Sequence, residues 1–412
     1  MIETEATETT SDGARPLPDG WRWVRLGDVG EIVTGATPPR EQAHFYGGMI
    51  PWIKPDDLDR AIYVKTSDEY LSDEGGHQAR LIPAGSVLVS CIGKLGKLAI
   101  AATSVATNQQ INAVVPRGDV DSVYLYYACR MMKSRLEAAA SRSLVPIVNK
   151  SAFSSLYIPL PPLSEQRRIA AILRERLAAV EQVRAAAAAQ LAAAQALPAA
   201  YLRTVFESDE AQAWPRVRLG DTAKVQSGYA FKSEWFVDDG IRLLRNANIF
   251  QDYISWEDQV CLPYERRGEF SAFELCDGDI VLSLDRPLVS NGLKIARISQ
   301  QDLPCLLLQR VARFQIHDDL DVDFLYTFLH TDAFITAITQ HDQSLGVPHV
   351  SPKQVETILI PYPPVAEQRR IAADLHDRLV EVERVSMNLQ EQLEEIVALP
   401  QALLRQAFAG EL

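Results

Sequence analysis

The sequence is poor in the residues that build disulfide frameworks and metal sites. Its 412 residues include 5 cysteines and 7 histidines, and no two cysteines form a CxxC pair. No HExxH pair of histidines occurs, so the spacing of these residues argues against a zinc knuckle and against a zinc hydrolase. We therefore expect reduced, mostly buried thiols and no metal bound by this chain.

Long apolar runs are also missing. No stretch reaches the roughly 18 to 20 uninterrupted apolar residues that a membrane span needs. The first twenty residues are acidic and rich in threonine, and they lack the apolar segment of a signal peptide. We expect a cytoplasmic protein in which residues 1–20 form a disordered tail.

Sequence signatures of catalysis are incomplete. The stretch SCIGKLGKLA resembles a phosphate-binding loop, but Cys91 stands where the first glycine is required and Leu98 where Ser or Thr would hold magnesium. A glycine-rich turn between strands is the favoured interpretation, and its lysines could still reach DNA phosphates. No GxSxG elbow occurs, and IPLPPL and IPYPPV lack the Asn that begins an adenine methyltransferase loop. We expect a non-catalytic chain.

The charge balance alone argues against a nucleic-acid partner. The formal net charge is −13, which disfavours a polyanion. The excess is uneven, however, because residues 207–359 hold 24 acidic and 14 basic side chains. A local basic cleft can therefore coexist with an acidic face elsewhere.

An internal repeat covers most of the chain. Such a repeat constrains the architecture more strongly than the assignment of any single helix or strand. The matched segments are WVRLGDVGEIVTG (23–35) with PRVRLGDTAKVQSG (215–228), PAGSVLVS (83–90) with CDGDIVLS (276–283), TNQQINAVV (107–115) with LLLQRVARF (306–314), VPIVNK (145–150) with VPHVSP (347–352), and PPLSEQRRIA (161–170) with PPVAEQRRIA (363–372). Each copy begins with short β-branched runs, continues with short helices and ends at prolines.

A long helix with the 3.5-residue period of a coiled coil follows each copy. Alanines of the first helix stand where the second has leucine or isoleucine, which favours close packing between unlike helices. We expect a break or kink at Pro198 and Pro400. Before it, Glu165 to Leu197 would form a rod of about 50 Å at about 1.5 Å per residue. Packing of two helices in one core, with no spacer role, is the alternative. The seam residues are Ile169, Leu173, Leu177, Val180, Val183 and Leu191, then Ile371, Leu375, Leu379, Val382, Val385, Leu389, Leu393 and Ile396.

These segments together resemble the specificity subunit of type I restriction-modification enzymes. The resemblance rests on WVRLGDV, PAGSVLVSCIGKLGKLAI, TNQQIN, the two helix starts and the closing LLRQAFAGEL, and it spans Trp21 to Leu412. It implies a mixed α/β fold in which two globular target-recognition domains are joined by two long antiparallel coiled-coil helices with a pseudo-twofold repeat. The expected parts are the tail (1–20), recognition domain 1 (21–160), a spacer helix (161–206), recognition domain 2 (207–361) and a second spacer helix (362–412).

The resemblance also implies a function. Each recognition domain would read one half of a bipartite double-stranded DNA target, and the helices would set the spacing and bind two modification subunits. Those subunits would bind S-adenosylmethionine and methylate adenine, and restriction subunits would cleave DNA using ATP, while this chain binds no cofactor. A rod of about 50 Å corresponds to roughly 15 base pairs.

The expected DNA contacts are basic and amide side chains, which can pair with guanine and adenine. A solvated surface role is the alternative at each position, and Gln109 and Gln309 gain support because they are matched in the repeat. Two other functions stay open: a protein-interaction scaffold, and a methyltransferase whose motifs are missing. The expected contacts are Lys54, Lys94, Lys97, Asn108, Gln109, Gln110 and Lys150 in the first domain, and Arg245, Asn246, Arg286, Asn291, Lys294, Gln309, Arg310 and Lys353 in the second.

Overall fold

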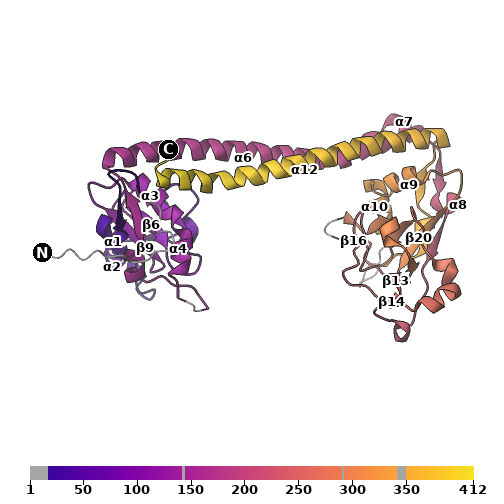
Figure 1. Ribbon diagram of the computed structural model, residues 1–412, viewed down its shortest axis with the longest axis horizontal. Helices are drawn as coiled ribbons and strands as arrows, with labels where there is room; N and C mark the ends of the chain where they lie inside the picture. Colours follow the sequence, from indigo (N-terminus) through magenta and orange to yellow (C-terminus); the bar gives the residue numbers. More distant parts are fainter. Residues whose placement is uncertain (1–16, 142–143, 290–291, 341–348) are drawn as a thin grey trace. The chain divides into compact units, whose positions relative to one another are not determined.

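The computed structural model describes residues 17–141, 144–289, 292–340 and 349–412. They form two compact units (Figure 1). Unit 1 comprises Met1–Ala188 and Glu391–Leu412, and unit 2 comprises Ala189–Gln390. Each unit therefore contains a part of both long helices. Within the N-terminal tail, residues 1–16 lie outside the described residues.

Within the described residues, the first copy of the repeat contains ten strands before its long helix. In chain order its elements are β1 (Arg22–Arg25), α1 (Leu26–Val29), β2 (Gly30–Thr34), η1 (Ala43–Phe45), β3 (Tyr46–Ile53), η2 (Pro55–Asp57), β4 (Tyr63–Val64), β5 (Tyr70–Leu71), α2 (Asp73–Gln78), β6 (Val87–Ser90), β7 (Leu98–Ala101), β8 (Ala106–Thr107), β9 (Ile111–Pro116), α3 (Ser122–Met131), α4 (Lys133–Ala138), α5 (Lys150–Ser154), β10 (Tyr157–Leu160) and α6 (Leu163–Phe206).

The second copy follows the same plan. Its elements are α7 (Asp209–Ala213), β11 (Arg216–Arg218), α8 (Leu219–Thr222), β12 (Ala223–Ser227), η3 (Ser233–Trp235), β13 (Ile241–Leu244), β14 (Cys261–Leu262), η4 (Tyr264–Phe273), β15 (Ile280–Ser283), β16 (Leu288–Val289), β17 (Gly292–Leu293), β18 (Ile295–Arg297), η5 (Gln300–Asp302), β19 (Cys305–Leu307), β20 (Val311–Ile316), α9 (Val322–Phe328), α10 (Asp332–Gln340), α11 (Pro352–Glu356), β21 (Leu359–Pro361) and α12 (Val365–Ala409).

A five-stranded sheet with the order β2-β9-β6-β7-β4 forms the centre of unit 1. Its pairs are antiparallel except β7 with β4. Strand β6 reads VLVS and is buried throughout, as expected for a strand that is covered on both faces. Val87 and Val89 lie in the core shared with α3 and the long helices, and Leu88 lies in a second core. The alternation of side chains thus makes the sheet a wall between two cores.

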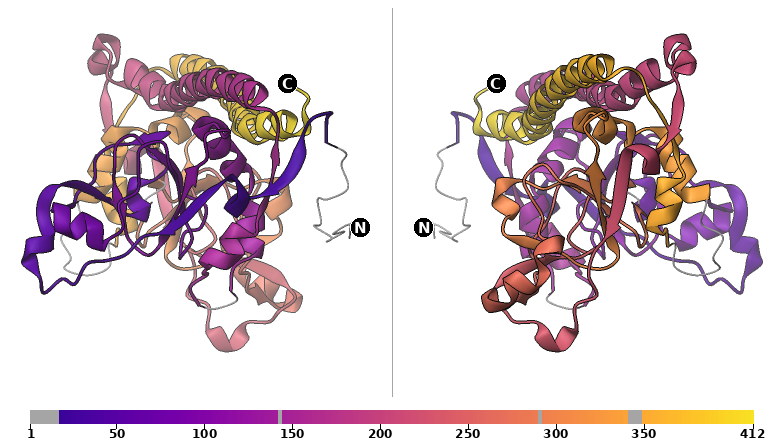
Figure 2. Two further views of the ribbon diagram at one scale, coloured as in Figure 1. Left: turned by 90° about the vertical axis from the view of Figure 1, so that its left-hand side faces the viewer. Right: turned by 90° about the vertical axis from the view of Figure 1, so that its right-hand side faces the viewer.

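Unit 2 repeats this wall with the sheet β12-β20-β15-β18, and the small sheet β5-β3-β8 returns as β14-β13-β19. Ile280 and Leu282 of β15 point into one core and Val281 into the other. Figure 2 shows unit 1 nearest the viewer on the left and unit 2 on the right. One difference lies near the sheet edge, where the hairpin β16–β17 of unit 2 replaces the glycine-rich loop of unit 1.

Both long helices continue through their prolines. Helix α6 spans Leu163–Phe206 with Pro198 inside it, and α12 spans Val365–Ala409 with Pro400 inside it. The expected break at these prolines is therefore wrong. With 44 and 45 residues, each helix is about 66 Å long at about 1.5 Å per residue, which is longer than the expected rod.

Packing of the segments beyond the prolines explains this continuity. Leu202 and Phe206 of α6 are buried in the core of unit 2, and Leu404 and Phe408 of α12 are buried in the core of unit 1. Burial of such a side chain stabilises by about 1.5–3 kcal/mol. Two of them therefore offset the cost of an interior proline, which is about 3 kcal/mol.

The two long helices pack antiparallel. In unit 1, Leu173 near the start of α6 shares a core with Phe408 near the end of α12. In unit 2, Phe206 at the end of α6 shares a core with Leu375 near the start of α12. The mixed α/β fold with long antiparallel helices is therefore confirmed.

Burial of the seam residues varies along the helices. The small residues Ala187 and Ala194 are buried at 8% and 6% exposure. Several larger seam residues are half-buried, which fits a two-helix seam because the partner helix covers only one side of each side chain. Val183 is 53% exposed. The buried seam residues are Ile169, Leu173, Leu191, Ile371, Leu375 and Val382, and the half-buried ones are Leu177, Val180, Leu379, Val385, Leu389, Leu393 and Ile396.

A buried glutamine fixes the start of each long helix. Gln166 Nε2 donates to the carbonyl oxygens of Asp119 (3.1 Å) and Pro161 (2.9 Å), and its Oε1 accepts from the backbone N–H of Asp121 (2.8 Å). Gln368 makes the matching bonds to the loop before α9. A buried amide that satisfies its donors and its acceptor fixes the start of the long helix to the globular part of its unit.

Candidate nucleic-acid interface

Four loops meet at one edge of the sheet in unit 1. The backbone N–H of Asn108 donates to Ile53 (3.3 Å), and that of Cys91 donates to Gln110 (2.7 Å). Gly93 donates to Pro146 (3.0 Å) and Val148 donates to Cys91 (2.8 Å). These backbone bonds join residues 54–60, 91–97, 108–110 and 146–149, which we call the loop face of unit 1.

Unit 2 builds the corresponding face with three bonds that match those of unit 1. Leu308 donates to Leu244 (3.2 Å), Leu284 to Arg310 (2.8 Å) and Val350 to Leu284 (2.9 Å). The loop face of unit 2 comprises residues 245–252, 284–289, 292–294, 308–310 and 349–352. The repeat therefore preserves the position of the loops as well as the strands.

The residues expected to contact DNA gather on these two faces. Asn291 lies outside the described residues. The others lie in the face loops, except Lys150 and Lys353, which are the first residue of α5 and the second residue of α11. The exposed ones are Lys94, Gln109, Lys150, Arg286, Gln309, Arg310 and Lys353, the half-buried ones are Lys54, Lys97, Gln110, Arg245, Asn246 and Lys294, and Asn108 is buried.

Two of the expected lysines tie the loops together internally. Lys97 Nζ lies 3.0 Å from the carbonyl oxygen of Pro55 and 2.9 Å from Asp56 Oδ1. Lys294 Nζ donates to the carbonyl of Asn246 in the matching place. Burial, aided by nearby Arg286, lowers the pKa of Lys294. The ammonium groups of Lys97 and Lys294 bond to backbone carbonyls of neighbouring loops. Their presence in both copies of the repeat therefore has a structural reason.

The basic residues after β3 and β13 are also engaged. Lys54 pairs with Glu69 and lies 4.7 Å from the centre of the Trp52 ring. Arg245 lies 3.0 Å from Asp258 and is 22% exposed. Each positive charge is therefore partly balanced by an acid of a neighbouring segment, which reduces its attraction for phosphate.

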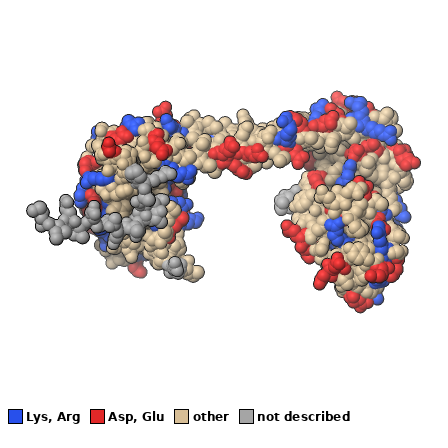
Figure 3. Space-filling model, in the orientation of Figure 1, with Lys and Arg blue, Asp and Glu red and all other residues tan. Residues whose placement is uncertain are grey.

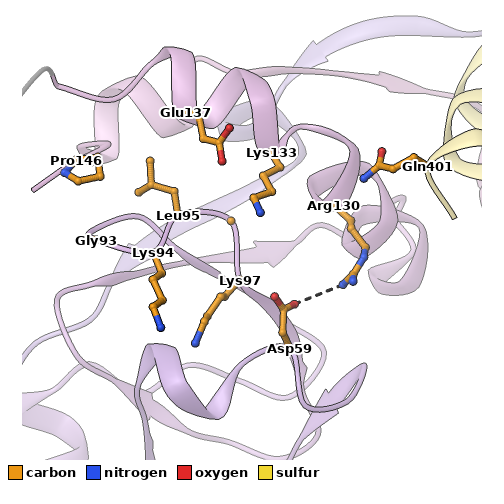
Figure 4. Close-up of a pocket in the computed structure, with 11 residues that line it drawn as sticks. Asp59, Gly93, Lys94, Leu95, Lys97, Arg130, Lys133, Glu137, Pro146 and Gln401 are labelled. Atoms are coloured by element: carbon orange, nitrogen blue, oxygen red, sulfur yellow. Dashed lines mark hydrogen bonds and ion pairs between the residues drawn. The ribbon is translucent and has the colours of Figure 1, made fainter. Parts of the chain in front are cut away.

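A basic depression lies beside the glycine-rich loop of unit 1 (Figure 4). Its volume is about 590 Å³. In Figure 4, Lys133 points toward the glycine-rich loop, and Lys94 and Lys97 extend from the opposite side of that loop. The stem of Lys133 crosses Gly96, whose φ is +76°, and a Cβ there would come within 3.1 Å of it. The lining residues are Asp59, Gly93, Lys94, Leu95, Gly96, Lys97, Arg130, Lys133, Glu137, Pro146 and Gln401.

Arg130 and Lys133 of this depression were missed by the sequence reasoning. They lie at the end of α3 and the start of α4, in a segment whose amphipathic pattern indicates a helix and nothing more. The signal that could have found them is their shared helical face, because residues three apart are neighbours on a helix.

The matching place in unit 2 has different chemistry. Arg310 Nη1 lies 3.0 Å from His349 Nε2 and 3.6 Å from Asp285 Oδ1, and His349 Nδ1 lies 2.7 Å from the same carboxylate oxygen. In unit 1 the corresponding bridge joins Ile92 and Ile147. One unit therefore presents a charged cluster where the other presents aliphatic side chains.

Two buried cysteine thiols have raised pKa values. Burial raises the pKa of Cys91 to about 11 and that of Cys305 to about 12, so these thiols stay protonated near neutral pH. Within the described ranges, His, Cys, Asp and Glu form no group of three or more that could hold a metal ion. The same residues include no helix with the length and apolar character needed to cross a bilayer. Positive and negative side chains are interspersed on the visible face of each unit (Figure 3).

The sequence is similar to known proteins of one family. The sequence model of the type I restriction modification DNA specificity domain matches twice, over residues 18–185 and 212–395. The type I restriction enzyme MjaVIII specificity subunit of Methanocaldococcus jannaschii is 28% identical over 385 residues, which cover 89% of this chain and 88% of that protein. The EcoAI specificity subunit of Escherichia coli is 46% identical over 171 residues, which cover 41% of this chain and 29% of that protein.

Solved structures share the fold. The HsdS subunit from Thermoanaerobacter tengcongensis superposes with a TM-score of 0.66 at 23% identity, over 97% of this chain and 99% of that one. A chain from work on the assembly and conformational transition of the type I R-M system gives 0.75 at 23% identity, over 96% and 100%. The sequence matches and the fold agree with the resemblance inferred from the repeat, which is thereby confirmed. The chain belongs to the family of type I restriction-modification DNA specificity proteins.

Proposed function

We propose that this chain reads DNA for a type I restriction-modification complex, and that unit 1 and unit 2 each bind one half of a bipartite double-stranded target. One observation supports this most strongly: the loop face is built twice, with the same backbone bonds and with different side chains. Two loop faces with matching backbone and different side chains suit two half-sites of different sequence, because side chains read the base edges.

The proposal assigns the chemistry to partner subunits. Two modification subunits would bind S-adenosylmethionine and methylate adenine, restriction subunits would cleave DNA using ATP, and this chain would bind none of these cofactors. All five cysteines are free thiols, which suits the reducing cytoplasm. The long helices would hold the half-sites at a fixed separation, which a flexible linker could not do.

The decisive experiment is enrichment of DNA from a randomised duplex pool by the chain together with its modification partner. The expected result is a two-part motif separated by a fixed, unspecified gap. Methylation mapped across host DNA with and without this protein should return the same motif. A pool that stays random, while the chain still captures its protein partner, would favour the scaffold function instead.

The basic depression of unit 1 gives a quantitative prediction. Replacing Lys94 and Lys133 by alanine should weaken binding equally for all sequences and lower the slope of log K against log salt by about 1.8, because each phosphate contact contributes about 0.9. Binding titrations from 50 to 200 mM salt measure this slope. The matched control replaces Lys65 and Lys224, which are exposed outside the loop faces. Equal slopes for the two double variants would refute a phosphate site here.

A further inference from the structure

The two units share an aspartate in an uncommon backbone conformation. Asp59 has a φ of +62° and Asp252 a φ of +66°, a region in which Asp and Asn are enriched among non-glycine residues. The backbone N–H of Asp59 donates to Leu98 (2.9 Å), and that of Asp252 donates to Ile295 (2.8 Å). These acceptors are the first residues of β7 and β18. The two aspartates are therefore equivalent, and each pins a loop of its face to the sheet.

In unit 1 an arginine completes the anchor. Arg130 Nη1 lies 3.4 Å from Asp59 Oδ1 and donates to the hydroxyl of Tyr126 at 3.0 Å. A guanidinium remains charged throughout the physiological pH range. The link between this loop and α3 therefore does not depend on the protonation of a histidine.

In unit 2 a histidine takes the place of the arginine. His330 and Tyr326 stand 200 residues after Arg130 and Tyr126. His330 Nδ1 donates to the carbonyl oxygen of Tyr326 at 2.8 Å, and Nε2 lies 2.8 Å from Asp252 Oδ1. The Tyr326 hydroxyl donates to the same oxygen at 2.6 Å. Both ring nitrogens face oxygens that accept, and the protonated imidazolium alone carries a proton on both.

The charged groups around this anchor act in opposite directions. Burial lowers the pKa of His330 and Arg297 on β18 adds to this, but Asp252 and the Tyr326 carbonyl outweigh them, so the pKa is raised overall. Burial raises the pKa of Asp252, and the bonds from His330 and Tyr326 lower it further than that. Arg297 itself lies 2.6 Å from Asp323 on α9. The negative charge of Asp323 offsets part of the repulsion between Arg297 and protonated His330.

The anchored loop carries an exposed aromatic pair. Phe250 and Tyr253 stack with ring centres 4.9 Å apart and planes 5° apart, and they are 37% and 57% exposed. The backbone N–H of Phe250 donates to Tyr253 at 3.1 Å, which closes the turn around Asp252. Neutral His330 would carry a proton on only one ring nitrogen, so either Asp252 or the Tyr326 carbonyl would lose its donor and the anchor of this turn would weaken.

We propose that His330 and Asp252 are positioning residues that hold the 245–256 loop of unit 2 while His330 is protonated, so that the second half-site is read less well as the pH rises and the first is not. The part concerning half-sites rests on the proposed function. The anchoring of the loop does not.

The direction of the pH dependence follows from linkage. A histidine whose pKa is higher in the folded protein contributes stability that is fully present below its unfolded value of about 6.5 and is lost as the pH rises through the folded value. Asp252 has the reverse dependence, and its contribution is lost as the pH falls through its lowered pKa, in the acidic range. The anchor therefore holds between the lowered pKa of Asp252 and the raised pKa of His330, and it weakens as the pH rises through the latter.

Amide hydrogen exchange of the full chain tests the anchor without DNA. After correction for intrinsic rates, protection of residues 246–256 should fall with rising pH by up to about tenfold for each unit of pKa difference, while residues 54–60 stay constant. His330→Arg should abolish the fall in unit 2, and Arg130→His should create one in unit 1. Asp252→Asn, which retains the backbone conformation, should give low protection at every pH. A wild-type loop with constant protection, or an Asp252→Asn variant with the wild-type profile, would overturn the proposal.

Binding by the chain with its modification partner then tests the functional part, with the duplex recovered by enrichment as probe. Substitutions in the second half-site should cost less affinity at high pH than at low pH, and His330→Arg should remove this difference. If hydrogen exchange of the loop changes with pH but the affinity cost of substitutions in the second half-site does not, the anchor has no role in DNA recognition and this part of the proposal is overturned. Failure to enrich any duplex would overturn the proposed function and leave the exchange result standing.

Discussion

Deleting one heptad from both long helices should shorten the gap between the DNA half-sites by about three base pairs, because seven helical residues span about 10.5 Å and each base pair about 3.4 Å. The half-sites themselves should not change. Suitable deletions are Ala185–Leu191 from α6 and Met387–Leu393 from α12, which occupy matched positions in the repeat. Loss of whole heptads preserves the 3.5-residue seam, so the helices can still pair.

Enrichment from the randomised pool measures both the new gap and the old half-sites. Affinity for the original target should fall toward the non-specific level, on the order of a thousandfold. The control replaces residues 387–393 by alanine without deletion, which alters the same surface and leaves the helix length unchanged. A variant that is folded, is shortened in both helices and keeps the original gap would show that the helices do not set the spacing.

Replacing Arg310 by glutamine should change the second half-site and leave the first intact. The guanidinium is 51% exposed and is oriented by His349 and Asp285. A bidentate contact of arginine with guanine contributes about 1–3 kcal/mol of discrimination. Its loss should reduce the preference at one base by roughly 10- to 100-fold, since 1.4 kcal/mol corresponds to a factor of ten. Glutamine is the residue at the matched turn of unit 1, at Gln110.

Competition binding with single-base variants of the enriched duplex measures this effect. The reciprocal change, Gln110→Arg, serves as the control and should alter the first half-site alone. Both turns are held by the same backbone bond, from Leu284 to Arg310 and from Cys91 to Gln110, and both substitutions leave this backbone bond in place. An unchanged motif for Arg310→Gln would exclude this side chain from base recognition.

The architecture could be predicted because local and global signals agree. Buried runs such as VLVS and IVLS are β-branched and short, and they form the central strands in both copies. The residues chosen as DNA contacts follow strand ends marked by glycine or proline, so they fell on loops. The duplication then placed equivalent loops on equivalent edges.

The role of each loop residue could not be predicted, because it depends on contacts between distant segments. Lys94 and Lys97 look alike in the sequence, but Lys97 Nζ bonds to Pro55, 42 residues earlier. The same holds at the helix start, where nothing in the repeated PPLSEQRRIA segment marks the buried Gln166 that makes the long-range bonds.

Proline is a second instance in which tertiary packing overrides a local rule. The sequence around Pro198 and Pro400 has the features of a helix break. The segments that follow are held by buried leucine and phenylalanine side chains. No local sequence pattern shows that these side chains pack in a core that also contains the opposite end of the other long helix.

The distribution of the five thiols has a practical consequence for spectroscopy. All five cysteines lie within the described residues; four are buried, and Cys276 is exposed. Burial raises the pKa of Cys129 and Cys261 as well as those of Cys91 and Cys305. A maleimide dye at neutral pH should therefore attach to unit 2 at one native position without any engineering. Uptake of further dye would report unfolding, since each additional thiol becomes reactive when its core opens.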